Sequence, residues 1–350
     1  MKKICFFLSA ALVAFAATMV SCSSEDNAVN NEEQKPTVKN GDDLKAAIEN
    51  CATVVYGVPT LTLPAGVSIT MNEPIEINYP LVIKGDKDQP ATITVGENGS
   101  IVTTNAISIE GVNIDADAQT TNLISMKDTA PEEWANIGFE LKNVTIDGLK
   151  KSLFYSASKN WLFPFFTLDN CVVEVAGDVT VIDFTKGGAA VEINLTNSTF
   201  YAPTATTKSF YSSQSGQKVT EAGADYTQTF NIENCTMYNL AKAKNFFSHR
   251  QSNQKWLTYN VKNNVFVNCG KSGQTIKGLN GGQGGANPTW DIVGNVFNFD
   301  DADTSAEEST GDEAEPVKQS VAVVMSFVNP ELGDFSQTVT AAGDPRWIIK

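Results

Sequence analysis

The stretch Phe230-Asn231-Ile232-Glu233-Asn234-Cys235-Thr236-Met237 contains the pattern that decides the fold. Apolar and polar residues alternate on both sides of Asn234, which is typical of strands that bury one face. Asparagine and glycine both tolerate the left-handed αL conformation, and a short bend between two strands would need that conformation. The stretch therefore predicts a strand, an αL bend at Asn234 and a second strand.

The same pattern recurs along the chain, with an Asn or Gly marker every 26 to 37 residues. A half-copy ends at Gly85, and seven full copies follow, with markers at Gly111, Asn143, Asn170, Asn197, Asn234, Asn263 and Gly294. Repeats of this length and content are typical of the coils of a parallel β-solenoid. The alternative is an antiparallel sandwich with Asn-containing turns. A sandwich would not require the same inward phase on both sides of every marker.

A third strand is predicted in each coil, between one marker and the next. The candidates are residues 123–126, 153–156, 181–184, 210–213, 246–249 and 275–278. A short helix over residues 42–48, with an acidic first turn, would cover the open end of the solenoid. We expect the aromatic stretch 161–166 to be mostly a loop over the core, and the acidic stretch 300–315 to be a mobile insertion.

Residues 1–21 have the features of a bacterial secretory signal. Met1-Lys2-Lys3 precedes an apolar run over 4–20, which is marginal in length for a membrane span. Cys22 follows Met19-Val20-Ser21, where signal peptidase II would cut, so we expect lipid on Cys22. The alternative is an ordinary signal peptide with an incidental cysteine. Residues 22–40 are polar and predict a flexible tether.

Charge and cysteine spacing exclude several classes of partner. The formal charge of −15 argues against nucleic acid and anionic headgroups, so membrane contact is expected through the lipid alone. The cysteines that follow Cys22 show no CxxC spacing, which makes a zinc site unexpected. Cys171 and Cys235 stand two coils apart, with Ser198 on the coil between them, so they are beyond disulfide reach and are predicted to fill the core.

Three features carry a family resemblance: the opening Leu81-x-Ile83-x-Gly85, the Asn markers, and the ending Gly343-Asp344-Pro345-Arg346-Trp347. Together they resemble Bacteroidota lipoproteins with pectate-lyase-like right-handed β-helices, which are domain families of unknown function. The resemblance implies a right-handed, single-stranded parallel β-helix over 41–350. It also implies a C-terminal cap over about 329–350 in which Arg346 is structural. Ser23-Ser24-Glu25-Asp26 resembles the tag that sends such lipoproteins to the outer surface of the outer membrane.

Counting from each marker, positions +1 and +3 should face inward and +2 and +4 outward. The +4 column contains three carboxylates on successive coils, Asp115, Asp147 and Glu174, followed by Tyr201 and Tyr238. Stacked carboxylates suit Ca²⁺, and open tyrosine rings suit stacking on sugars. The alternative is a solvated acidic column beside two structural tyrosines.

The third-strand face is where β-helix lyases and hydrolases usually carry their groove. Its outward columns contain Tyr155, Asp183, Arg250 and Lys277, and His249 is the only histidine of the chain. A pectate-lyase scheme needs several acids to bind Ca²⁺ and an Arg or Lys as base. A glycosidase scheme needs two carboxylates ~5–9 Å apart. Neither set is complete here, and a surface role for the His-Arg pair is the alternative. Trp161 and Tyr155 are further candidates for a carbohydrate-binding surface.

The sequence is compatible with three functions. The first is a lipid-anchored cell-surface β-helix that binds or scaffolds polysaccharide, with no certain cofactor beyond a candidate Ca²⁺. The second is a polysaccharide lyase or glycoside hydrolase. The third is an adhesin-like protein that binds a host or surface protein. The sequence does not indicate an oligomeric state.

Overall fold

The computed structural model describes residues 36–129, 131–213, 227–249, 256–270, 289–298, 321–322 and 324–349. Residues Thr37–Lys350 form one compact unit. The signal peptide, Cys22, most of the predicted tether, Arg250, Lys277, the third-strand candidate 275–278 and the acidic stretch 300–315 lie outside the described residues.

The predicted bends are confirmed at all seven markers. Each has a positive φ, from 49° at Asn197 to 69° at Gly294, as the αL region requires. Gly85, the marker of the half-copy, is not among the residues with positive φ. The strand before each bend enters one sheet and the strand after it enters another, so the markers form one corner of the solenoid.

Strands that precede the bends form the first sheet, called sheet I here. Its neighbours are parallel except for the antiparallel pair β1–β2 at its edge. In order across the sheet the strands are β1 (Thr53–Val55), β2 (Val58–Thr62), β5 (Leu81–Lys84), β8 (Ile107–Glu110), β12 (Phe139–Lys142), β15 (Trp161–Asp169), β18 (Ala189–Thr196), β21 (Gln228–Glu233), β24 (Leu257–Lys262) and β26 (Thr289–Val293), with β11 (Ala135–Asn136) paired to β15.

Strands that follow the bends form sheet II, which is parallel throughout its described strands. They are β3 (Ser68–Met71), β6 (Ala91–Val95), β9 (Val112–Asp115), β13 (Thr145–Leu149), β16 (Val172–Val175), β19 (Thr199–Tyr201), β22 (Thr236–Tyr238), β25 (Val265–Val267), β27 (Val296–Asn298) and β28 (Val321–Ala322).

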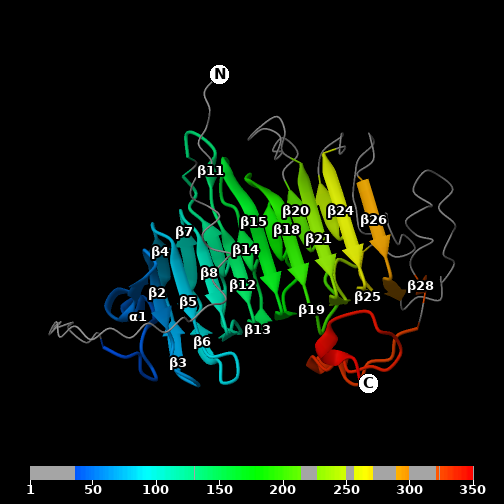
Figure 1. The fold of residues 1–350 in the computed structure, drawn as a ribbon, viewed down its shortest axis with the longest axis horizontal. Helices are drawn as coiled ribbons and strands as arrows, with labels where there is room; N and C mark the ends of the chain where they lie inside the picture. Colours follow the sequence, from blue (N-terminus) through cyan, green and yellow to red (C-terminus); the bar gives the residue numbers. More distant parts are fainter. Residues whose placement is uncertain are drawn as a thin grey trace, which may run out of the picture. The chain divides into compact units, whose positions relative to one another are not determined.

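The third strands form sheet III, also parallel. They are β4 (Pro74–Ile77), β7 (Ser100–Thr103), β10 (Ile124–Met126), β14 (Phe154–Tyr155), β17 (Ile182–Phe184), β20 (Tyr211–Ser213) and β23 (Phe247–His249). The predicted third strands within the described residues are therefore confirmed. The strands of successive coils lie side by side in Figure 1, and the parallel ladders rule out the antiparallel sandwich.

The interior is filled by residues of the same phase on successive coils. Phe139 stacks on Phe166 with ring centroids 4.3 Å apart, and Phe230 stacks on Tyr259 at 4.8 Å. Identical positions thus build columns of rings, which stabilise the core by burial and by ring contacts.

The aromatic stretch 161–166 is not a loop, contrary to the prediction. It begins the nine-residue strand β15, which pairs with β18 over most of its length and with β11 at its start. Phe163 and Phe166 are fully buried, and they make ring contacts with Phe154 of sheet III. The pairing of β11 and β18 on either side holds these residues in extended form.

The N-terminal end carries the predicted helix, α1 (Leu44–Cys51). Asp43 caps it by accepting a hydrogen bond from the Ala46 amide, so the first turn itself contains no acid and that detail of the prediction is wrong. Leu44, Ala47 and Ile48 are buried, and the helix packs against β2 and β3. Within the described residues, no helix is long and apolar enough to cross a membrane.

The C-terminal segment, residues 324–349, lies against the outer side of sheet II. It contains the short 3-10 helices η2 (Pro330–Leu332) and η3 (Pro345–Trp347). Phe335 contacts the rings of Tyr201 and Tyr238, and Ala342 packs in one cluster with Val265 and Val296. The expected cap therefore covers the side of several late coils (Figure 1).

Candidate functional site

The acidic column stands on sheet II as predicted, with Asp115 and Asp147 paired across β9 and β13. Burial and the nearby Asp115 and Asp117 raise the pKa of Asp147, and burial is the main reason that the pKa of Glu174 is raised. Lys150 Nζ contacts the Asp117 carbonyl oxygen close by. Among the described residues, no three His, Cys, Asp or Glu side chains are arranged to hold a metal ion. The calcium hypothesis therefore gains no support from the arrangement.

Tyr201 and Tyr238 do not present open rings. Tyr201 is only 5% exposed, its hydroxyl donates to Glu174 Oε2 at 3.2 Å, and its ring lies 5.3 Å from that of Phe335. Tyr238 contacts both Phe327 and Phe335. The C-terminal segment therefore packs against both rings. The structure gives no support to the assignment of these two tyrosines to carbohydrate binding.

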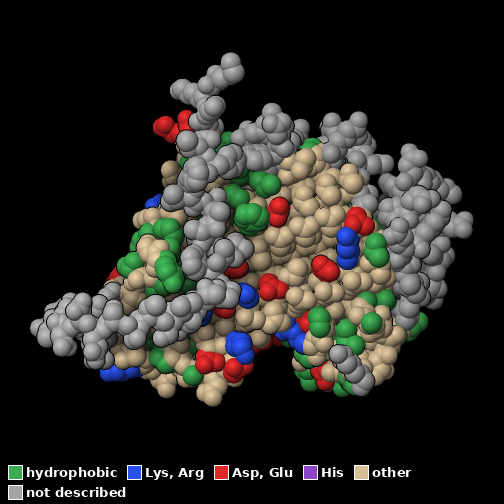
Figure 2. Space-filling view, in the orientation of Figure 1, with side chains coloured by type: hydrophobic (Ala, Val, Ile, Leu, Met, Phe, Trp, Pro, Cys, Tyr) green, Lys and Arg blue, Asp and Glu red, His purple; other side chains and the backbone are tan. Residues whose placement is uncertain are grey.

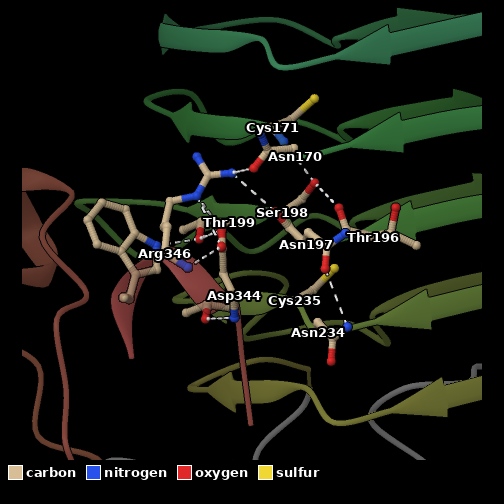
Figure 3. Close-up of polar contacts among 12 residues, drawn as sticks. Asn170, Cys171, Thr196, Asn197, Ser198, Thr199, Asn234, Cys235, Asp344 and Arg346 are labelled. Carbon is tan, nitrogen blue, oxygen red and sulfur yellow. Dashed lines mark hydrogen bonds and ion pairs between the residues drawn. The ribbon is translucent and has the colours of Figure 1, made fainter. Parts of the chain in front are cut away.

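Asp344 and Arg346 fasten the C-terminal segment to the coils (Figure 3). Asp344 is 1% exposed, accepts a hydrogen bond from the Thr199 hydroxyl at 2.8 Å and pairs with Arg346 Nε at 2.9 Å. Arg346 Nη2 then donates to Asn170 Oδ1 and to the Asn197 carbonyl at the αL corner. These contacts agree with the structural role expected for Arg346.

Gly343 allows the close approach. Its φ is 98°, and a Cβ atom there would lie 2.9 Å from Thr236 Oγ1 and 3.0 Å from a Val265 methyl. The Gly343 amide donates to the Asn263 carbonyl at 2.7 Å. The Gly-Asp-Pro-Arg-Trp ending thus fits the side of the solenoid through both backbone and side chains.

The third-strand face does not assemble a catalytic group among the described residues. Tyr155, Asp183, Ser212 and Ser248 share one column, as predicted from the sequence. Asp183 Oδ1 accepts from both the amide and the hydroxyl of Thr185, which marks it as part of a local turn. Tyr155 is half-buried there, and its pKa is raised by burial and by Asp183.

His249 and Trp161 face the interior, so neither can meet an external ligand as positioned. His249 is 1% exposed and its Nδ1 lies 3.0 Å from the Ser213 hydroxyl. Burial lowers its pKa to about 3, which keeps the ring neutral. Trp161 is 4% exposed and donates its indole N–H to Ser158. Both residues were proposed from the sequence, and their inward positions in β23 and β15 give no support to a role in ligand contact.

The described cysteines are free, and three of them are fully enclosed. Cys171, Cys235 and Cys269 are at most 4% exposed. Burial raises the pKa of Cys171 and of Cys269 to about 12, so both remain protonated. The prediction that Cys171 and Cys235 fill the core is confirmed.

The outer face of sheet I carries a row of polar side chains that the sequence reasoning missed. It consists of the residues three before each marker: Ser108, Glu140, Thr167, Asn194, Asn231, Asn260 and Asp291. Three asparagines form a continuous ladder, because Asn260 Nδ2 donates to Asn231 Oδ1 at 2.8 Å and Asn231 Nδ2 to Asn194 Oδ1 at 2.7 Å. Asn194 Nδ2 continues the ladder to Thr167 Oγ1 at 3.5 Å. Reading the −3 column of the aligned repeats would have found this row.

An apolar group lies beside the ladder, nearer the starts of the strands. Leu162 and Ala189 are packed together with the half-buried Trp134, Val191 and Trp256. Phe165, on the same face of β15 as Thr167, is 42% exposed. Figure 2 shows hydrophobic side chains gathered over the upper part of β15, while the rest of this face is mostly uncharged and polar.

The charges on this face are sparse and mostly negative. Between β12 and β26 the outward carboxylates are Glu140, Asp169, Glu192, Glu233 and Asp291, against Lys142 and Lys262. Lys262 pairs with Asp291 at 2.6 Å. Asp169 accepts hydrogen bonds from the Thr196 hydroxyl and from the side-chain amide of Asn197. Fixed amides, hydroxyls and an exposed ring are groups that hold sugars, whose hydroxyls both donate and accept hydrogen bonds.

Part of the chain is similar to a known family. The matching family is described as a domain of unknown function, DUF4957, and the match covers residues 68–203. These residues contain the coils from β3 to β19, including Thr167, Asn194 and Phe165. No curated protein is similar to the chain in sequence. The description of this family assigns no activity to it.

Proposed function

We propose that this protein is a lipid-anchored protein of the bacterial cell surface that binds polysaccharide on the outer face of sheet I. The Asn194–Asn231–Asn260 ladder is the observation that carries this proposal. Amides fixed by their neighbours present hydrogen-bonding groups without a large loss of side-chain entropy on binding. An exposed ring at Phe165 adds an apolar contact for a sugar face.

The N-terminal sequence supports both the lipid anchor and the location at the cell surface. Cys22 after a basic and apolar signal supports lipidation, and Ser23-Ser24-Glu25-Asp26 supports transport to the outer surface of the outer membrane. The resemblance to Bacteroidota surface lipoproteins with pectate-lyase-like β-helices supports the same location. Binding on a long solenoid face suits a long, repetitive ligand better than a small one.

A glycan panel tests the proposal against the two other functions. The purified protein should retain at least one polysaccharide on an affinity gel and release no new reducing ends. New reducing ends, or absorbance from unsaturated uronate, would identify a hydrolase or lyase instead. Binding to a surface protein that persists after its glycans are stripped would identify an adhesin. Failure to retain any polysaccharide of a broad panel would reject the binding proposal.

A further inference from the structure

We infer that the ligand of sheet I is a neutral, linear polysaccharide that lies across the strands along the asparagine ladder. This inference rests on the proposed function and adds the chemical class of the ligand, its site and its direction. Three observations carry it: the hydrogen bonds still available on the ladder, the spacing of its rungs and the charge around it.

Asn194 and Asn231 each keep half of their hydrogen-bonding capacity for a ligand. An asparagine amide has two N–H donors and two acceptor lone pairs. Within the ladder, Asn231 uses one donor on Asn194 and one lone pair on Asn260. One donor and one acceptor remain on the same amide, which matches a sugar hydroxyl that accepts and donates at once. The inter-amide bonds also hold the side chain in one orientation before any ligand arrives.

The spacing of the rungs sets the direction of the ligand. Asn194, Asn231 and Asn260 are register partners on adjacent parallel strands, so they repeat every ~4.8 Å across the sheet. This repeat is close to the length of one pyranose ring in an extended chain. A linear glycan across the strands therefore meets an equivalent amide at each sugar. Phe165 stands at the Thr167 end of this line, where its exposed ring can contact a terminal sugar face.

The charge around the ladder favours a neutral ligand. Glu192 lies beside Phe165 in the register of β15 and β18, and Glu233 lies two residues after Asn231. The outward carboxylates outnumber the lysines on this face, and the whole chain has a formal charge of −15. A polyanion such as a polyuronate would meet like charge along its length, which opposes association. A neutral glycan meets no such opposition.

The test compares Asn231→Thr with a matched substitution on another face. Threonine favours the strand conformation and removes the amide, so Kd for a neutral linear glycan should rise about tenfold. Asn113→Thr is the control, because Asn113 is a half-buried outward residue of β9 on sheet II. The probes are β-glucan, mannan and xylan as neutral chains, and polygalacturonate and alginate as polyanions. Circular dichroism and melting temperature check that both variants are folded.

The outcomes separate this inference from the proposed function. The expected result is binding of a neutral chain, with affinity that rises over the first few sugars and then levels, weakened by Asn231→Thr and unchanged by Asn113→Thr. Equal affinity of Asn231→Thr and wild type, or tighter binding of a polyanion, overturns the inference while glycan binding itself stands. Retention of no glycan by the wild type overturns the proposed function as well.

Discussion

Among the described residues, asparagine side chains have different roles at the marker corners, inside the coils and on the outer face of sheet I. At the corners, Asn234 adopts the αL conformation and donates to Asn197 of the coil before it. Inside, Asn264 and Asn295 are fully buried and satisfy backbone groups of neighbouring coils, as when Asn264 Oδ1 accepts from the Cys235 amide. On the outer face of sheet I, Asn231 belongs to the half-buried ladder. The same amide thus relieves backbone strain, pairs buried polar atoms and offers contacts to a ligand.

The corner column predicts a graded response to substitution at Asn234. Alanine in αL costs about 1 kcal/mol more than asparagine, and the hydrogen bond to Asn197 is lost too. Glycine avoids the conformational cost and loses only the hydrogen bond. Urea denaturation should therefore rank the stabilities as wild type, then Asn234→Gly, then Asn234→Ala. If alanine proves as stable as glycine, the αL conformation is not what selects asparagine here.

Buried His249 predicts a specific dependence of stability on pH. Its pKa is lowered to about 3 by burial, whereas an unfolded histidine titrates near 6.5. The neutral ring is fully compatible with folding above pH ~6.5. Below that pH the unfolded chain takes up the proton first, so stability falls progressively as the pH approaches about 3.

Replacing this histidine with phenylalanine isolates the effect. The difference in melting temperature between wild type and His249→Phe should shift in favour of the variant as the pH falls from 7 to 4. Other acidic and basic groups are common to both proteins, so their contributions cancel in the difference. If the difference in melting temperature between the two proteins stays constant from pH 7 to pH 4, protonation of His249 does not destabilise the folded protein.

At the scale of elements, the C-terminal segment predicts a local loss of stability when its fastening is cut. Asp344→Ala leaves the Arg346 guanidinium and the Thr199 hydroxyl without their buried partner. We expect a destabilisation of about 1–3 kcal/mol. Hydrogen exchange should rise in β19, β22 and β25, where the segment lies, before it rises in β5 and β8.

A surface ion pair provides the control for this substitution. Lys87 and Asp88 are exposed and pair at 2.6 Å, so Asp88→Ala should leave both the melting temperature and the exchange pattern close to wild type. If hydrogen exchange in Asp344→Ala rises equally in early and late strands, the C-terminal segment does not stabilise the late coils specifically.

The sequence predicted the strands well because strand phase and αL bends depend on a few neighbouring residues. Markers such as Asn143 and Asn263 adopt the expected conformation, and the third strands appear where the pattern placed them. The errors concern contacts that join distant segments. Tyr201 has the outward phase expected of it, but Phe335 arrives from more than a hundred residues away and covers it.

The candidate site was likewise predictable where it depends on the repeat pattern, and not where it depends on contacts between distant segments. The asparagine ladder was visible in the aligned repeats, since Asn194, Asn231 and Asn260 share one column. Its outward exposure beside Phe165 depends on the C-terminal segment lying on sheet II and not on sheet I. His249 was a candidate because it is the single histidine of the sequence, although its position between outward Ser248 and Arg250 already gives it an inward phase.

At the scale of the whole molecule, the proposed lipidation at Cys22 predicts where the protein is found in the cell. Cys22→Ser removes the thiol that would carry the lipid, so the protein should leave the membrane fraction. Its melting temperature should not change, because Cys22 precedes the compact unit Thr37–Lys350. Cell fractionation with immunodetection measures the first effect. Cys51→Ser, at the end of α1, is the control and should stay with the membranes; a Cys22→Ser protein that also stays there would contradict the anchor.

The enclosed thiols have a consequence for the redox behaviour of the fold. Cys171, Cys235 and Cys269 are free, protonated and shut inside the coils, and they belong to a core that parallel ladders and ring stacks already hold together. Folding therefore requires no disulfide formation or exchange at these positions. The coils should have the same stability in oxidising and in strongly reducing surroundings, and should resist thiol reagents until they unfold.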